Sequence, residues 1–145
     1  MKKNIFGFTL VEIMVVVAFM GIIASLTIPY MTSFYSRQQL NTLMDEVNGN
    51  LRRAQNNAII NKDNVSWGIT WHSTDYTIVK DPGGADEAVA ETFEIPNNYT
   101  ITGSDIIFEK LTGQTSTDTT ITISAASIDE QKQININQQG AVQSL

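Results

Sequence analysis

The feature that most constrains this chain is a long apolar run close to its N-terminus. From Phe8 to Met31 the sequence has 24 residues, and Glu12 is the only charged residue among them. As a helix the run would be about 36 Å long at roughly 1.5 Å per residue, which is enough to cross a bilayer. We therefore predict a membrane-spanning helix over residues 8–31.

A small residue just before the run predicts how the N-terminus is processed. An ordinary secretory signal has a shorter apolar core, and its cleavage site follows that core. Here Gly7 comes first, so a cut after Gly7 would remove the basic leader, residues 1–7, and leave the helix on the mature chain. Lys2 and Lys3 would hold the amino end on the cytoplasmic face, because basic residues favour that side.

Glu12 is not explained by a plain membrane anchor. A carboxylate this deep in a spanning helix costs about 2.5 to 3.5 kcal/mol unless a partner offsets the cost. A cut after Gly7 would place a new α-amino group on Phe8, four residues from Glu12. In a helical stack of similar subunits, that amine can pair with the Glu12 of a neighbour.

The stretch from Lys2 to Glu12 resembles the prepilin signal of type IV pilins and type II secretion pseudopilins. The resemblance implies that a membrane peptidase cuts after Gly7 and N-methylates Phe8, and that Glu12 guides assembly. It implies three partners: other pilin or pseudopilin subunits, the prepilin peptidase and N-methyltransferase, and an inner-membrane assembly platform. The alternative is an ordinary signal anchor.

Composition limits the remaining possibilities. The chain has 145 residues and a net charge of −6, and loss of Lys2 and Lys3 would change that charge to −8. Such a chain has no global attraction for nucleic acid or anionic lipid. The absence of cysteine excludes a disulfide framework, a thiolate nucleophile and a cysteine-based metal site.

The run is expected to continue into an amphipathic helix over residues 32–62. Pro29 would either bend the long helix, as the family resemblance implies, or mark where the helix leaves the lipid. The asparagine-rich stretch 56–64 predicts that the helix ends near residues 61–64. Its apolar stripe recurs at steps of three and four, as a packing face does, and consists of Leu40, Leu43, Val47, Leu51, Ala54 and Ala58.

From Val65 the pattern becomes that of β-strands. Val65, Trp67, Ile69 and Trp71 alternate with Ser66, Gly68 and Thr70, which is the periodicity of a strand. The segment 81–91 contains Pro82 and two glycines and is expected to be a loop. Further short strands are predicted at residues 76–80, 92–95, 99–102, 106–109, 119–124 and 133–137.

These elements predict an α+β fold. Strands that follow one another without intervening helices favour antiparallel pairing. We expect a long N-terminal helix, half transmembrane and half amphipathic, packed on a small antiparallel β-sheet domain. The expected segments are a leader at 1–7, a transmembrane and filament-core helix at 8–31, an amphipathic half at 32–62 and a β domain at 63–145.

The LRRAQNNAI stretch at the end of the predicted helix and the pattern of the C-terminal third resemble the GspH/FimT branch of minor pilins and pseudopilins. Members of that branch cap or initiate a filament and are present in few copies. The residues that carry this resemblance are the LRRAQNNAI stretch at the end of the helix, Ile107, Phe108, Gly113, 120–123, 133–137 and 140–142.

Residues that could carry other chemistry give weak patterns. His72 is the only histidine, and we interpret it as a solvated turn residue rather than part of a nucleophile relay. No metal site and no cofactor are expected. The acidic residues of the 81–91 loop form no EF-hand pattern; calcium binding is an alternative to a solvated loop.

DNA binding is the remaining alternative. Some FimT proteins bind DNA through a basic motif after the glycine that corresponds to Gly140. Here the end reads GAVQSL, and the nearest positive charges are Lys110 and Lys132. Arg52, Arg53 and Lys62 could form a patch, but an exposed helix face explains them equally well. Affinity for DNA needs several phosphate contacts, so nucleic acid is not expected as a partner.

The sequence thus predicts a structural subunit rather than an enzyme. We expect a minor pilin or pseudopilin of a type IV filament, near the tip or acting in initiation. The alternatives within the family are a minor pseudopilin of a type II secretion system and a DNA-binding minor pilin for natural transformation. The expected location is the cytoplasmic membrane, with the C-terminal domain outside the cytoplasm, and then a periplasmic or extracellular filament.

Overall fold

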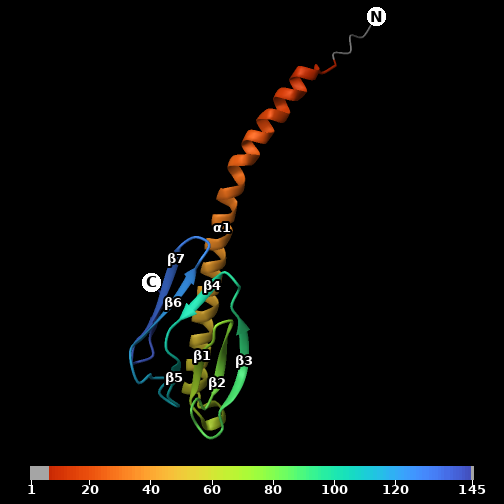
Figure 1. Cartoon of the computed structure of the whole chain (residues 1–145). Coiled ribbons are helices and arrows are strands. Elements are labelled where there is room, and N and C mark those ends of the chain that lie inside the picture. The colour runs from red at the N-terminus through yellow and green to blue at the C-terminus, as the bar shows by residue number, and fades with distance from the viewer. Residues whose placement is uncertain (1–6, 145) are drawn as a thin grey trace, which may run out of the picture. The chain divides into compact units, whose positions relative to one another are not determined.

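The computed structural model describes residues 7–144, without the side chains of residues 26–30 (Figure 1). One helix, α1, runs from Leu10 to Ile59. The chain divides into two compact units, Met1–Tyr35 and Ser36–Leu145, so α1 contributes to both. The predicted leader, apart from Gly7, lies outside the described residues.

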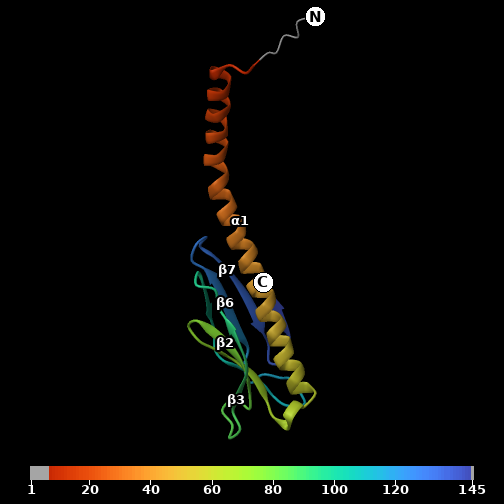
Figure 2. The same ribbon diagram turned by 90° about the vertical axis from the view of Figure 1, so that its right-hand side faces the viewer.

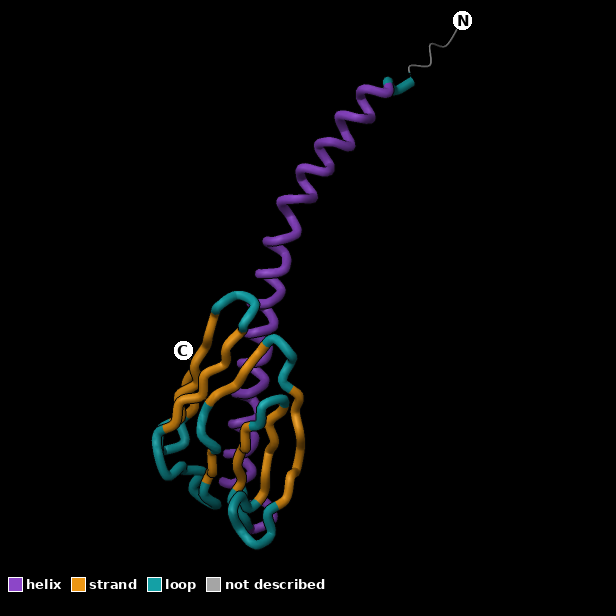
Figure 3. The backbone as a smooth tube through the Cα atoms, viewed as in Figure 1, coloured by secondary structure: helices purple, strands orange, loops and turns teal. Residues whose placement is uncertain are grey.

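The second unit contains two four-stranded antiparallel sheets (Figure 3). The first sheet has the order β3-β2-β1-β5 and the second has the order β4-β6-β7-β8. A short 3-10 helix, Lys62–Asn64, links α1 to β1. The strands are β1 Trp67–Trp71, β2 Asp75–Lys80, β3 Ala88–Glu94, β4 Tyr99–Thr102, β5 Ile106–Phe108, β6 Thr119–Ala125, β7 Glu130–Ile136 and β8 Val142–Ser144.

The part of α1 from Ser36 onward lies along both sheets, as Figures 1 and 2 both show. Its predicted apolar stripe is confirmed, because all six of its residues are buried in the core. Met44, which the stripe did not include, is buried as well. The α+β class predicted from the sequence is therefore correct.

The sheets supply the other side of the core through alternate residues. In β1, Trp67 and Ile69 are buried and Trp71 packs against the core at its margin, as does Val65, which precedes the strand. The predicted inward face of this strand is confirmed. In the second sheet five of the seven buried residues are isoleucines, which suit a pleated, buried surface. They are Ile101, Ile121, Ile123, Ile134 and Ile136.

Three expectations about the strands were wrong. Residues 88–91 were predicted as loop but belong to β3, where they pair with β2 across a bulge between Ile78 and Val79. Strand β7 begins at Glu130 rather than at residue 133, and β8 was not predicted. In each case pairing with a neighbouring strand, which local sequence does not encode, decides the outcome.

Candidate functional site

The start of α1 is organised by Thr9. The Glu12 backbone N–H donates to Thr9 Oγ1 at 3.2 Å, and the Ile13 N–H donates to the Thr9 carbonyl oxygen at 3.3 Å. A threonine at the N-cap followed three residues later by glutamate is the sequence of a capping box. Glu12 therefore lies in the first turn, where a carboxylate complements the helix dipole.

The segment that follows exposes its apolar side chains. Every large apolar side chain from Phe8 to Ile23 is at least 44% exposed, and Phe8 is 80% exposed. Burying one such side chain fully is worth about 1.5–3 kcal/mol, so together these residues strongly favour an apolar environment. The length and hydropathy required of a membrane-spanning helix are met by no helix in the described part of the chain.

Gly7 and Pro29 were the other predicted site residues. A Cβ atom built on Gly7 meets no described atom within 4 Å, so local packing does not require a glycine there. The helix assignment continues through position 29. The structure does not describe the side chain of Pro29, and the bend expected there remains a prediction.

Three contacts hold the point where α1 enters the folded domain. The Tyr99 hydroxyl donates to the Ser36 carbonyl oxygen at 2.9 Å. The Ser127 and Ser36 hydroxyls are 3.2 Å apart, and Arg37 Nε lies 2.9 Å from Glu130 Oε1. These contacts join α1 to the second sheet and to its β6–β7 turn.

A buried tyrosine joins the middle of α1 to the first sheet. Tyr76 is fully buried and its ring stacks on Phe93 at 5.1 Å between centroids. Asn50 Nδ2 donates to the Tyr76 hydroxyl at 2.9 Å, and that hydroxyl donates to Glu46 Oε1 at 3.2 Å. Burial is the main cause that raises the pKa of Tyr76; the Asn50 hydrogen bond lowers it and the nearby Glu46 raises it further.

The end of α1 is joined to two glycine turns by Gln55. Its Nε2 donates to the carbonyl oxygens of Gly113, at 3.1 Å, and Gly140, at 2.8 Å. Gly113 has φ +66° and Gly140 has φ +79°, and a Cβ on Gly140 would lie 2.2 Å from the Gly113 oxygen. Both glycines belong to the pattern that suggested the GspH/FimT branch. Gln55 was not predicted from the sequence as a functional residue, although it lies in the LRRAQNNAI stretch that resembles that branch.

The residues considered for other chemistry have structural contacts. His72 Nδ1 lies 3.6 Å from Asp75 Oδ2, which is too long for a hydrogen bond. In the acidic segment, Asp81 and Glu87 accept backbone N–H groups of their own loop. Arg53 forms a two-contact ion pair with Glu91. Within residues 7–144, no three acidic or histidine side chains are grouped in a way that could hold a metal ion.

A family model described as type II transport protein GspH matches residues 43–140. A fimbrial protein of Pseudomonas aeruginosa is 36% identical over 72 residues, which cover 50% of this chain and 46% of that protein. The type IV major fimbrial protein FimA of Dichelobacter nodosus is 43% identical over 54 residues, which cover 37% of this chain and 34% of that protein. The chain thus spans less than half the length of these relatives.

A solved structure has a similar fold. It is that of the minor pseudopilin EpsH from the type 2 secretion system of Vibrio cholerae, with a TM-score of 0.58. The match covers 72% of this chain and 94% of that chain, at 13% sequence identity. At this identity the likeness concerns the fold alone.

Proposed function

This chain belongs to the GspH family, and from that membership we propose that it is a structural subunit of a type IV pilus-like filament. Its role is assembly rather than catalysis. The observation that carries the proposal is the exposed apolar segment from Phe8 to Ile23, which contains a single carboxylate and continues into a domain with a closed core of its own. Such a segment is stable only among other apolar groups, as in lipid or a bundle of similar helices.

We propose the following path for the chain. A prepilin peptidase cuts after Gly7, and Phe8 is N-methylated. Residues 8–31 hold the subunit in the cytoplasmic membrane, with the β domain outside the cytoplasm, until the assembly platform extracts it. In the filament the apolar helices form the centre, and Glu12 pairs with the amino terminus of a neighbour. The subunit is a minor component that acts near the tip or in initiation.

Two machines use such subunits, namely the type IV pilus and the type II secretion system. The family model favours the pseudopilin, whereas the fimbrial relatives favour the pilin. We therefore keep the secretion role as the second candidate. We do not propose DNA binding, because residues 141–145 contain no arginine or lysine.

The proposal is tested with variants of Glu12 in the host. Glu12→Gln removes the charge with little change in size, and Glu12→Leu makes the run wholly apolar. Both variants should be processed and membrane-bound. Their recovery in sheared filaments should fall about tenfold or more, because the buried amino terminus of the neighbouring subunit would lose its partner. Mass spectrometry of the mature chain reports whether cleavage after Gly7 and methylation occur.

Glu46→Gln is the matched control, because Glu46 is an exposed glutamate of the same helix outside the apolar segment. It should enter filaments as the unaltered chain does. Normal recovery of both Glu12 variants would refute the pairing, and an N-terminus other than Phe8 would refute the cleavage site. Counting surface pili in a deletion strain then separates the two machines: loss of pili indicates a pilin, and retained pili with failed secretion indicate a pseudopilin.

A further inference from the structure

The outward face of the second sheet consists of uncharged polar side chains. Strand register places nine side chains in three cross-strand rows on the face opposite the buried isoleucines of this sheet. All nine are threonine, serine, glutamine or asparagine. The rows are Thr100, Ser124 and Gln131; Thr102, Thr122 and Gln133; and Thr120, Asn135 and Gln143. We call these nine residues the polar grid.

The polar grid is uncharged on an acidic protein. The chain has a net charge of −6, and the outward face of the first sheet carries Asp75 and Glu94 directly opposite each other. No grid residue is buried, so each can reach a ligand. Every side chain of the grid can both donate and accept a hydrogen bond. The nine grid side chains therefore offer no opposite charge to a charged polymer and no apolar surface to an apolar partner.

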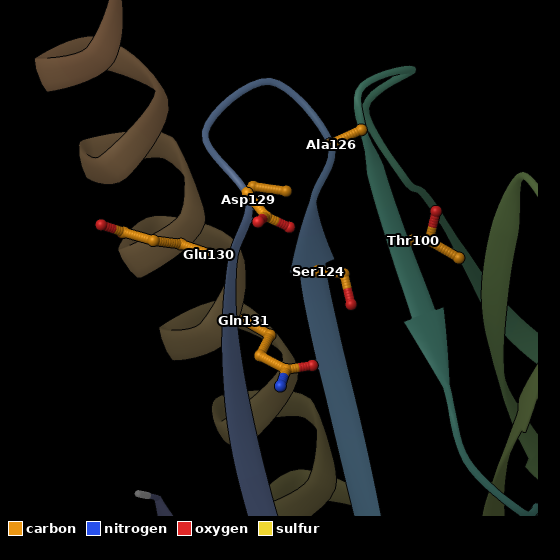
Figure 4. A pocket seen from close by; sticks show the side chains of 7 residues that line it. Thr100, Ser124, Ala126, Asp129, Glu130 and Gln131 are labelled. Carbon is orange, nitrogen blue, oxygen red and sulfur yellow. The ribbon is translucent and has the colours of Figure 1, made fainter.

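The first row of the grid borders a hollow (Figure 4). The hollow has a volume of about 370 Å³, and its lining includes Thr100, Ser124, Gln131 and Asp129. That volume lies in the range of small-molecule sites, about 300–1,000 Å³. The Glu130 side chain points away from the other labelled residues in Figure 4 and pairs with Arg37, which leaves Asp129 as the unshared carboxylate at the rim. A carboxylate can accept two hydroxyl hydrogen bonds at once.

From these observations we propose that the polar grid binds a neutral polysaccharide, with one sugar ring in the hollow beside Asp129. A sugar ring presents hydroxyl groups that donate and accept, as the grid does. The sheet repeats its side chains about 4.8 Å apart across strands and about 6.8 Å apart along them, so a polymer can contact several rows at once. Each contact is weak, and their number supplies the affinity. This role goes beyond the assembly function and does not depend on it.

The test is electrophoresis of the full chain through native gels that contain a polysaccharide. The chain is held in a zwitterionic detergent without a sugar headgroup, so that the detergent does not compete. The probes are the neutral polymers dextran, mannan and galactan, with alginate as the anionic comparison. At least one neutral polymer should retard the chain, and alginate should not.

Two lysine substitutions test the location. Thr122→Lys puts a charge at the centre of the grid and should weaken retardation about twofold to tenfold, the loss expected for one or two hydrogen bonds. Gln131→Lys, at an exposed site beside the hollow, gives the same result if Thr122→Lys fails to fold. Thr92→Lys is the control, since Thr92 is an exposed outward residue of the first sheet, and should leave retardation unchanged.

Three results would overturn the proposal. The first is that no neutral polymer retards the chain, and the second is that alginate retards it equally. The third is that the grid variants migrate as the control does. If those variants are instead lost from filaments while retardation is unchanged, the face is a subunit contact and the polysaccharide proposal is wrong.

Discussion

Replacing Tyr76 by phenylalanine should reveal how α1 is held against the first sheet. The substitution keeps the ring that stacks on Phe93 and removes the hydroxyl that contacts Asn50 and Glu46. A hydrogen bond contributes about 0.5–1.5 kcal/mol net to stability. Glu46 is exposed, so water can replace its lost donor, whereas Asn50 is half-buried. We therefore expect Tyr76→Phe to lower the free energy of unfolding by about 1–2 kcal/mol at neutral pH.

The effect should depend on pH in a defined direction. Burial, the largest cause, raises the pKa of Tyr76 above its ordinary value of about 10. Above that pH the unfolded chain releases the phenolic proton while the folded chain retains it. The contribution of the raised tyrosine pKa to the free energy of unfolding is thus complete below about pH 10. It falls by about 1.4 kcal/mol for each pH unit above that, until the pH reaches the pKa of Tyr76 in the folded chain. The phenylalanine variant lacks this loss.

Urea unfolding followed by tryptophan fluorescence measures both effects, because the Trp71 ring lies 5.5 Å from that of Tyr76. The unaltered chain should be the more stable at about pH 8, and the difference should vanish or reverse near pH 11. In a Glu46→Gln variant the loss of stability with rising pH should end at a lower pH, since the Glu46 charge helps to raise the pKa of Tyr76. A difference that stays constant from pH 8 to 11 would refute the claim that burial controls this group.

Three further substitutions test the domain. Gly140→Ala should destabilise the chain by about 1–3 kcal/mol in thermal unfolding, because position 140 has a positive φ and the new methyl group would meet the Gly113 oxygen. Gly49→Ala lies on an open helix surface and should instead stabilise the chain by about 1 kcal/mol. Equal effects of the two substitutions would contradict this account. Leu51→Ala should lower the free energy of unfolding, measured in urea, by about 2–5 kcal/mol, because Leu51 is fully buried on the apolar stripe of α1. A change near zero would mean that the helix does not pack on the sheets in this way.

Periodic patterns in the sequence predicted the parts of the fold that they encode. The helical stripe that includes Leu40 and Leu51 and the alternation of Trp67 with Ile69 both identified buried faces correctly. The resemblance to the GspH branch was correct as well, as the family match to residues 43–140 confirms. These features are local repeats whose apolar residues share one face, so a single sequence is enough to reveal them.

Pairing between distant segments was not predictable in this way. Strand β8 has three residues and exists because it pairs with β7, while the start of β3 pairs with β2 beyond a bulge. Gln55 gains its role only when the turns at Gly113 and Gly140, far apart in sequence, meet at the end of α1. The cap at Thr9 differs from these, since its spacing from Glu12 could have been recognised in the sequence.

The division of the chain explains why assembly can be tested apart from folding. Among the described residues, the core cluster begins at Leu40 and ends at Ile136, and all of it lies within the unit Ser36–Leu145. The apolar side chains from Phe8 to Ile23 add nothing to that core, since each is exposed. A change at Glu12 should therefore leave the unfolding of the domain unaltered while it reduces incorporation into filaments. A variant that lost both together would mean that the two units depend on each other, and loss of filaments could not then be assigned to the carboxylate.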